Sequence, residues 1–161
     1  MRAAGKTLHL DFLMQFSGKS VAVELKYKTK RFAQDIAEER YELANHGAHD
    51  HGGYDFIKDI YRLEEICTHV ENCEGWAIML TNDASYWKTP STNAYPNFRL
   101  TEGRILRGEI GWPEKAVVGT KQNREMVIQL AGTYTLNWND YATINDGAHV
   151  FKYLALHVKS A

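Results

Sequence analysis

The chain has 161 residues, 44% of them hydrophobic, and a formal net charge of −1 with seven histidines counted as neutral. Its length and apolar content predict one domain over residues 1–161 with its own core. No apolar run approaches the roughly 20 residues that span a bilayer, so we expect no membrane segment. A net charge close to zero excludes a protein that coats nucleic acid through bulk electrostatics, because such binding scales with cationic contacts.

The two cysteines and the N-terminal segment both bear on the cellular compartment. Cys67 and Cys73 match neither a disulfide framework nor a zinc motif, and they predict free thiols. Residues 1–6 are basic, but the segment that follows contains His9 and Asp11 and lacks the apolar core of a signal peptide. These observations favour a reducing compartment, with the cytoplasm as the default.

Two strand-like runs joined by a short polar break form the first structural unit. The runs and the break are residues 8–16, residues 20–27 and Ser17-Gly18-Lys19. A two-residue loop at Ser17-Gly18 would pair positions that sum to 35, so Asp11 would lie opposite Glu24 with Cβ atoms roughly 4.5–5.5 Å apart. A three-residue loop would shift the sum to 36 and place Asp11 opposite Leu25.

Two carboxylates that face each other on neighbouring strands repel, by roughly 3 kcal/mol at about 5 Å and an effective dielectric near 20. The apolar neighbours of Asp11 and Glu24 indicate central strands, where unpaired charges are costly. A hard divalent cation removes the conflict, because Mg²⁺ binds one or two carboxylates together with waters and phosphate oxygens. The simpler alternative is a solvated edge carboxylate or a cross-strand pair with a lysine.

Lys26 adds an amine to this pair of acids. Side chains alternate faces along a strand, so Lys26 shares the face of Glu24 and stands roughly 6.6–6.8 Å further along. An amine at that distance can orient or deprotonate a water beside a metal, or in its ammonium form stabilise charge on a phosphate.

An Asp on one strand, followed by Glu-x-Lys on the next, resembles the PD-(D/E)XK nuclease superfamily, which has the restriction-endonuclease-like fold. Residues 54–64 and 75–82 are similar to the helix and the central strand that follow the active-site hairpin in an uncharacterised bacterial branch. The clear resemblance covers about residues 8–87. Leu10 stands where the family has a proline. Only seven residues precede Leu8, so the helix that usually comes first is absent, supplied by a partner, or outside this sequence.

The resemblance implies an α/β fold with a central mixed β-sheet flanked by α-helices. It also implies hydrolysis of phosphodiester bonds with Mg²⁺ or Mn²⁺, and DNA as the substrate. Asp11, Glu24 and the backbone carbonyl of Leu25 would hold the metal, and Lys26 would assist the attacking water. A homodimer is compatible with cutting both strands of a duplex. Two alternatives stay open: an inactive nucleic-acid-binding or assembly subunit of the same fold, and a metal-dependent hydrolase of small phosphoesters.

Basic residues cluster on the second strand and directly after it, with only Glu24 opposing them. Lys28, Lys30 and Arg31 are the residues that we expect to contact nucleic acid. The alternative is that they form a solvated strand end.

Residues 31–45 read as a weakly amphipathic helix, and residues 46–53 as a glycine-bracketed loop. The loop holds three histidines and Asp50, which suits either a mobile loop bordering the substrate cleft or a transition-metal site. The clearest helix covers residues 54–71, with apolar residues at steps of three and four. A second stripe on it contains Asp55, Asp59 and Arg62, of which we expect Asp59 and Arg62 to pair on the surface or to fix the helix to the sheet.

The C-terminal half holds the remaining expected strands. Residues 76–81 form a nearly continuous apolar run, typical of a strand covered on both faces. Residues 82–124 are polar and punctuated, with dispersed aromatics that either stack on unpaired bases or seal the rim of the core: Trp87, Tyr95 and Trp112. Residues 126–138 and 150–158 read as later strands, with a connecting corner at residues 138–141.

Overall fold

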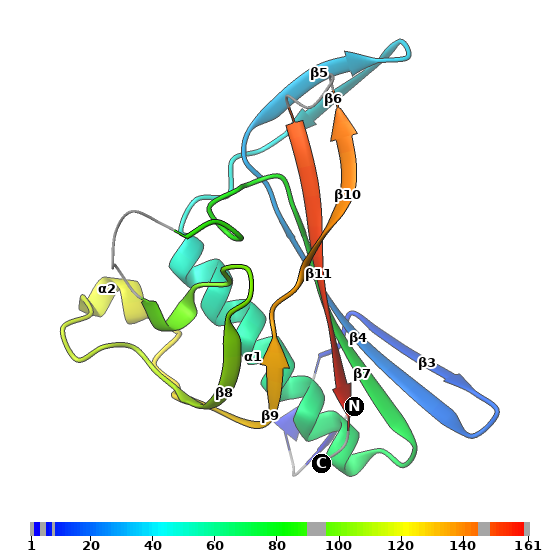
Figure 1. Ribbon diagram of the computed structural model, residues 1–161. Helices are drawn as coiled ribbons and strands as arrows, with labels where there is room; N and C mark the ends of the chain where they lie inside the picture. The colour runs from blue at the N-terminus through cyan, green and yellow to red at the C-terminus, as the bar shows by residue number, and fades with distance from the viewer. Residues whose placement is uncertain (1, 4–5, 8, 90–95, 145–148, 160–161) are drawn as a thin grey trace.

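A five-stranded mixed sheet forms the centre of the protein (Figure 1). The computed structural model describes residues 2–3, 6–7, 9–89, 96–144 and 149–159. The strand order is β10-β11-β7-β4-β3, with bounds Trp138–Ile144, His149–Lys159, Cys73–Thr81, Lys19–Lys28 and Phe12–Phe16. β4 and β7 are parallel, and the other neighbours are antiparallel. The predicted α/β fold with a central mixed sheet is confirmed at this level.

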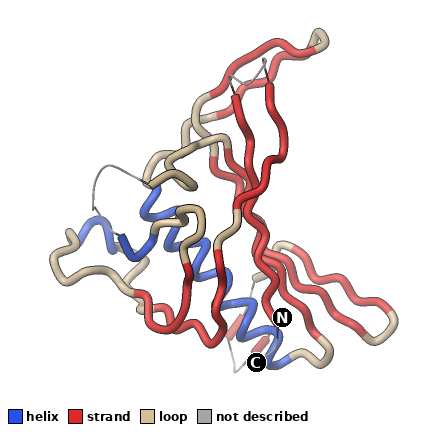
Figure 2. Tube along the Cα trace, in the orientation of Figure 1, coloured by secondary structure: helices blue, strands red, loops and turns tan. Residues whose placement is uncertain are grey.

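Smaller elements surround the sheet (Figure 2). In the described ranges, three two-stranded ribbons are β1–β2 (Arg2–Ala3 and Lys6–Thr7), β5–β6 (Phe32–Ile36 and Glu39–Leu43) and β8–β9 (Ile105–Ile110 and Ile128–Thr135). The same ranges contain two short helical turns, η1 (Pro96–Phe98) and α2 (Val118–Lys121). The β5–β6 ribbon projects beyond one end of the sheet, whereas β8–β9 lies on the same side of the sheet as the long helix.

The long helix α1 (His49–His69) lies between β4 and β7 in the chain and packs on one face of the sheet. A crossover of this kind is what two parallel neighbouring strands require. Most of its buried side chains are apolar, and they include Phe56, Ile57, Ile60, Leu63 and Ile66. Among the described residues, no helix is both long and apolar enough to cross a membrane. Cys67 on α1 and Cys73 on β7 are buried free thiols, as predicted.

Gly53 on α1 packs closely against the η1 segment. A Cβ atom at this position would lie 1.7 Å from the backbone oxygen of Phe98, a residue that is 1% exposed. Because backbone cannot swing aside as a flexible side chain does, we expect Gly53→Ala to lower the free energy of unfolding by roughly 1–3 kcal/mol. Urea denaturation measures this. Gly119→Ala, with no atom within 4 Å of the added Cβ, is the matched control. Equal losses in the two variants would contradict the packing argument.

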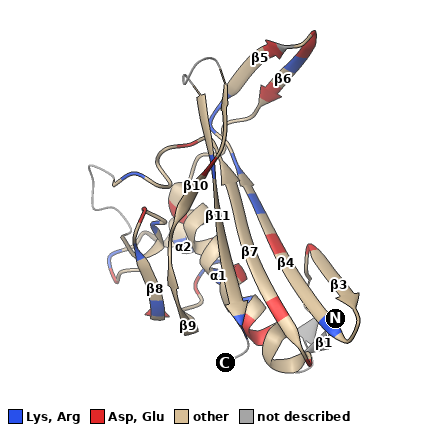
Figure 3. Cartoon of the chain, turned by 45° about the vertical axis from the view of Figure 1, so that its right-hand side comes forward, with Lys and Arg blue, Asp and Glu red and all other residues tan. Residues whose placement is uncertain are grey.

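The opposite face of the sheet carries no helix within the described part of the chain. Large apolar side chains are exposed there, among them Phe12, Met14 and Phe16 on β3, with exposed fractions of 55%, 48% and 54%. β3 is therefore an edge strand and not the central strand that its apolar residues predicted, and it carries no charged residue (Figure 3). An apolar run alone does not separate a buried strand from an exposed edge.

The predicted helix over residues 31–45 is wrong, because this segment forms the β5–β6 ribbon. Ala37 and Glu38 make its two-residue turn with φ values of 48° and 70°. Such left-handed turns normally contain Gly, Asn or Asp, so the sequence gives no turn signal here. Phe32 anchors the ribbon, since its side chain is 4% exposed and its ring packs against those of His149 and Phe151.

The predicted loop over residues 46–53 is also wrong in part, because α1 begins at His49. Gly52 and Gly53 lie inside the helix and not in a loop. Their lack of a side chain admits the Tyr86 hydroxyl and the Phe98 backbone, respectively. A glycine pair usually indicates a turn or a loop. Here both glycines lie in a helix, because other segments pack closely against them.

Strands near the predicted ranges 76–81 and 150–158 are confirmed as β7 and β11. The run 126–138 is divided differently, because β9 ends at Thr135 and β10 begins at Trp138. Residues 138–141 therefore belong to a strand and not to a corner. The break falls after Leu136, whose N–H donates to the carbonyl of Arg104 (2.8 Å) and so extends the β8–β9 pairing by one residue.

Candidate active site

The β3–β4 hairpin has the predicted two-residue loop. Paired residues sum to 35 from Phe16↔Lys19 to Phe12↔Val23, and Ser17 and Gly18 take φ values of 47° and 76°. The three-residue alternative is therefore wrong. The ladder ends one pair before Asp11 and Glu24, so these two residues are not a strand pair.

The side chain of Asp11 instead forms a hydrogen bond with the backbone of β4. Its Oδ2 accepts a hydrogen bond from the backbone N–H of Leu25 at 2.7 Å. In an antiparallel ladder, alternate residues direct both N–H and C=O toward the same neighbour. The carbonyl of Leu25 therefore faces the same edge of β4 as the carboxylate of Asp11.

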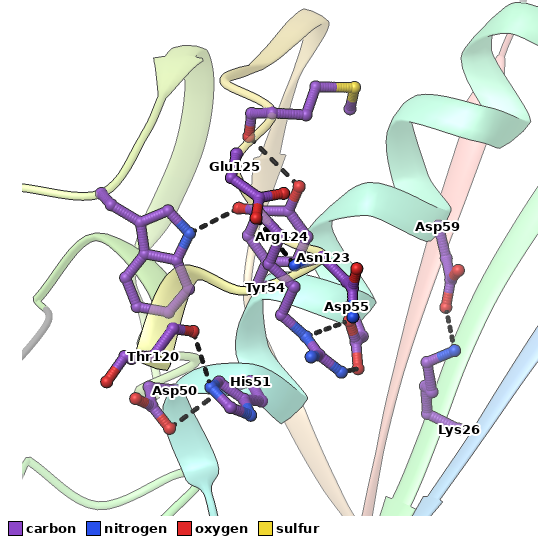
Figure 4. A network of polar contacts seen from close by, with 12 residues as sticks. Lys26, Asp50, His51, Tyr54, Asp55, Asp59, Thr120, Asn123, Arg124 and Glu125 are labelled. Atoms are coloured by element: carbon purple, nitrogen blue, oxygen red, sulfur yellow. Dashed lines mark hydrogen bonds and ion pairs between the residues drawn. The ribbon is translucent and has the colours of Figure 1, made fainter. Parts of the chain in front are cut away.

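Glu24 and Lys26 lie on the face of β4 that packs against α1, and both meet charged partners there. Glu24 is 4% exposed, and its Oε1 lies 2.7 Å from Nη2 of Arg62. Lys26 Nζ lies 2.7 Å from Oδ2 of Asp59, as Figure 4 shows. Arg62 also reaches Asp59, with 3.2 Å between Nη1 and Oδ1. These contacts tie α1 to the sheet.

The cluster contains more acid than base. Asp11, Glu24 and Asp59 supply three carboxylates against the two cations Lys26 and Arg62. Glu24 Oε1 and Asp59 Oδ2 are fully buried, and neither has a partner in hydrogen-bond geometry among the described residues, although each lies 2.7 Å from a cation. An ion pair without that geometry offsets desolvation incompletely.

The pKa values of the two buried acids reflect this excess. Burial is the main cause that raises the pKa of Glu24 to about 7, and the charge of Asp59 raises it next; Arg62 and Lys26 oppose the shift, and Asp11 adds to it. Burial also raises the pKa of Asp59, against the opposing effects of Lys26 and Arg62. An additional cation beside Glu24 would stabilise its ionised form.

The donors near Glu24 suit a hard divalent cation. No group of three His, Cys, Asp or Glu side chains converges on one point in the described ranges. Mg²⁺ needs fewer, because it binds one or two carboxylates and keeps several waters. Glu24, Asp11 and the Leu25 carbonyl fit that requirement.

The three basic residues predicted to bind nucleic acid follow the site in the chain. Lys28 ends β4, and Lys30 and Arg31 lie in the connection to β5. Asn82, just after β7, fixes this connection: its Oδ1 accepts from Lys30 N–H at 2.8 Å, and its Nδ2 donates to the Lys30 carbonyl at 3.1 Å. The basic residues are therefore positioned by the carboxyl ends of two adjacent strands.

The histidines near the start of α1 do not form the transition-metal site that was one reading of the sequence. Nδ1 of His46 contacts Thr29, Nε2 of His49 lies 2.7 Å from Oδ2 of Asp83, and Nε2 of His51 lies 2.9 Å from the carbonyl of Thr120. Three separate partners hold them apart.

The polar stripe of α1 contributes more to the site than its sequence pattern indicates. Asp59 and Arg62 do fix the helix to the sheet, which was one of the two readings, and they also contact the predicted site residues. Asp55 turns away to Arg124, with contacts of 2.8 and 2.9 Å (Figure 4). The useful signal was the position of this stripe beside the apolar one on the same helix.

The dispersed aromatics pack at the edge of the core, as one of their two readings expected. Trp112 packs against Phe98 and donates from its ring N–H to the Arg124 carbonyl at 2.7 Å. Trp87 packs against Trp138. Tyr95 lies outside the described residues.

No family model, curated protein or solved structure matches this chain. The site chemistry is therefore the basis for a functional proposal.

Proposed function

We propose that this chain is a Mg²⁺- or Mn²⁺-dependent nuclease with a restriction-endonuclease-like core. The observation that carries the proposal is the partly buried cluster around Glu24, where the buried carboxylates of Glu24 and Asp59 and the exposed carboxylate of Asp11 outnumber two cations, and the Glu24 pKa rises to about 7. A hairpin, a crossover helix and a parallel strand surround this cluster, and their arrangement supports the family resemblance.

In this proposal Asp11, Glu24 and the Leu25 carbonyl hold the metal. When bound, the metal would lower the pKa of a water and neutralise charge on the scissile phosphate. Lys26 positions the attacking water through its ammonium. Asp59 holds Lys26 in place from the opposite side, and Arg62 orients the carboxylate of Glu24.

DNA is the proposed substrate, on the basis of the family resemblance. The positions of the basic residues are compatible with a nucleic-acid strand that runs past the site. Lys28 and Lys30 follow Lys26 by two and four positions, which is roughly 7 and 13 Å along an extended chain. One nucleic-acid strand can contact Lys26, Lys28 and Lys30. Cutting both strands of a duplex would favour a homodimer.

A second candidate is a nucleic-acid-binding or assembly subunit without turnover. The observation that favours it is that Lys26 and Glu24 already form ion pairs with Asp59 and Arg62. In that case the charges serve to lock α1 onto the sheet.

A cleavage assay separates the candidates. Purified protein is incubated with plasmid, linear duplex or single-stranded DNA, in Mg²⁺ or Mn²⁺ and in EDTA. The nuclease proposal predicts products only with metal, and none from Asp11→Asn. Intact DNA together with turnover of small phosphoesters would point to a hydrolase of small substrates. Intact DNA that nevertheless binds the protein would point to the inactive subunit.

A further inference from the structure

A basic cavity of about 610 Å³ lies where β4 and β7 end and β11 begins. Its lining includes Lys30, Arg31, Asn82, Trp87, Lys88 and Lys152. In open α/β sheets, ligands bind outside the carboxyl ends of parallel strands. The cavity occupies that position, and Lys30 on its wall lies four residues after Lys26.

The charge of the lining favours an anion. Of the nine described residues that line it, four are Lys or Arg and none is Asp or Glu, whereas the whole chain has 19 Lys or Arg in 161 residues. Within the described part of the chain, Lys30, Arg31 and Lys88 have no carboxylate partner. Lys152 does pair with Asp140 at 2.6 Å, but the Asp140 side chain is 77% exposed, so solvent screens that pair.

The backbone that presents these cations is held in place. Asn82 makes both hydrogen bonds to the backbone of Lys30, as described above. The preceding residue, Thr29, is 1% exposed, and its hydroxyl donates to the Ala44 carbonyl at 2.6 Å. The backbone at Lys30 and Arg31 is therefore already ordered before a ligand binds, which reduces the entropic cost of binding.

Trp87 gives the cavity one aromatic wall. Its ring is half-buried and packs against Trp138, with centroids 5.9 Å apart. An aromatic side chain beside cations is the combination with which proteins bind unpaired bases. The volume lies within the roughly 300–1,000 Å³ of small-ligand sites, which suits one nucleotide and not a base-paired duplex.

From these observations we infer that the cavity binds one unpaired, phosphate-bearing nucleotide of a nucleic-acid strand. Its phosphate would meet Lys30, Lys88 and Lys152, and its base would lie against Trp87. The inference rests on the proposed nuclease function for its role, since it names single-stranded or unpaired nucleic acid as the substrate class. Binding itself does not require the metal or turnover.

Binding measured in EDTA tests the inference separately from cleavage. The probes are a fluorescent single-stranded oligonucleotide and the blunt duplex of the same sequence, titrated at several salt concentrations. We expect tighter binding of the single strand. Lys88→Glu should weaken it roughly tenfold and lower the salt slope by about 0.7, the value for one lost phosphate contact. Lys88→Arg keeps the positive charge and should bind the single strand as the wild type does. Lys19→Glu, at the end of β4 far from the cavity, should leave the affinity unchanged.

Several results would overturn the inference. One is equal weakening by Lys88→Glu and Lys19→Glu, which would indicate only general electrostatics. Another is equal affinity for the single strand and the duplex. A third is competition by inorganic phosphate as effective as that by a mononucleotide, which would remove the role of the base. Selective binding without any cleavage would keep this cavity and reject the proposed nuclease.

Discussion

Lys26→Met is expected to slow Mg²⁺-dependent DNA cleavage by roughly 10²–10³-fold, the range typical when one preorganised hydrogen-bond donor is removed from a reaction centre. The substitution keeps the length of the side chain and removes the ammonium that lies 2.7 Å from Asp59. No other amine of β4 shares this contact among the described residues. Single-turnover cleavage of a labelled DNA strand measures the effect on the chemical step.

Two controls separate catalysis from folding in this experiment. Lys19→Met removes the same charge from the same strand at an exposed position outside the site, and it should cleave at the wild-type rate. Lys26→Arg keeps a cation beside Asp59 but replaces the compact ammonium with a larger planar guanidinium, which cannot take the same position beside the attacking water. It should melt as the wild type does and remain slow. Full activity in Lys26→Met, with the protein folded, would contradict the role assigned to Lys26.

Glu24→Gln is expected to change how the stability of the metal-free protein depends on pH. Because the folded-state pKa of Glu24 is raised from 4.5 to about 7, the folded protein holds a proton that the unfolded chain releases. The resulting stabilisation is complete below about pH 4.5 and is lost as pH rises through about 7. Between pH 5 and pH 8 the loss is about 2–3 kcal/mol.

Urea denaturation in EDTA at these two pH values measures that loss. Glutamine does not titrate, so the pH difference in Glu24→Gln should be smaller by about 2–3 kcal/mol than in the wild type. Glu109→Gln, at an exposed position of β8, is the matched control and should retain the wild-type difference. Identical pH dependence in the wild type and Glu24→Gln would show that Glu24 is not the titrating group.

The proton on the Glu24 carboxylate should compete with the metal for that carboxylate. Mg²⁺ needs the ionised form of Glu24, so its apparent affinity should rise with pH up to about 7 and then level off. Calorimetric titration at pH 6 and pH 8 measures this, and the heat should include proton release at the lower pH. An affinity independent of pH would argue against Glu24 as a ligand.

The sequence was sufficient for elements that are specified locally. Ser17-Gly18 supports left-handed backbone, so both the hairpin and its register followed from it. The three- and four-residue spacing of the α1 stripe identified the helix, and the apolar run in β7 identified a central strand. In each case the local signal and the tertiary environment agree.

The elements that were predicted wrongly depend on contacts between distant segments. Ala37-Glu38 forms a turn without turn-type residues, and Gly53 is helical because Phe98 packs against it. Contacts in the candidate site also depend on segments that are distant in the sequence. Lys26 meets Asp59 only because α1 crosses back over β4, and no local spacing encodes that contact. The basic cavity likewise combines three strand ends that are far apart in the sequence.

A crystal of this protein soaked in Mn²⁺ provides the most direct test of the ion-binding site. The proposal predicts an anomalous peak that touches the carboxylates of Asp11 and Glu24 and the main-chain oxygen of Leu25. A peak that lies elsewhere, or none at all while Arg62 still occupies the carboxylate of Glu24, would contradict it.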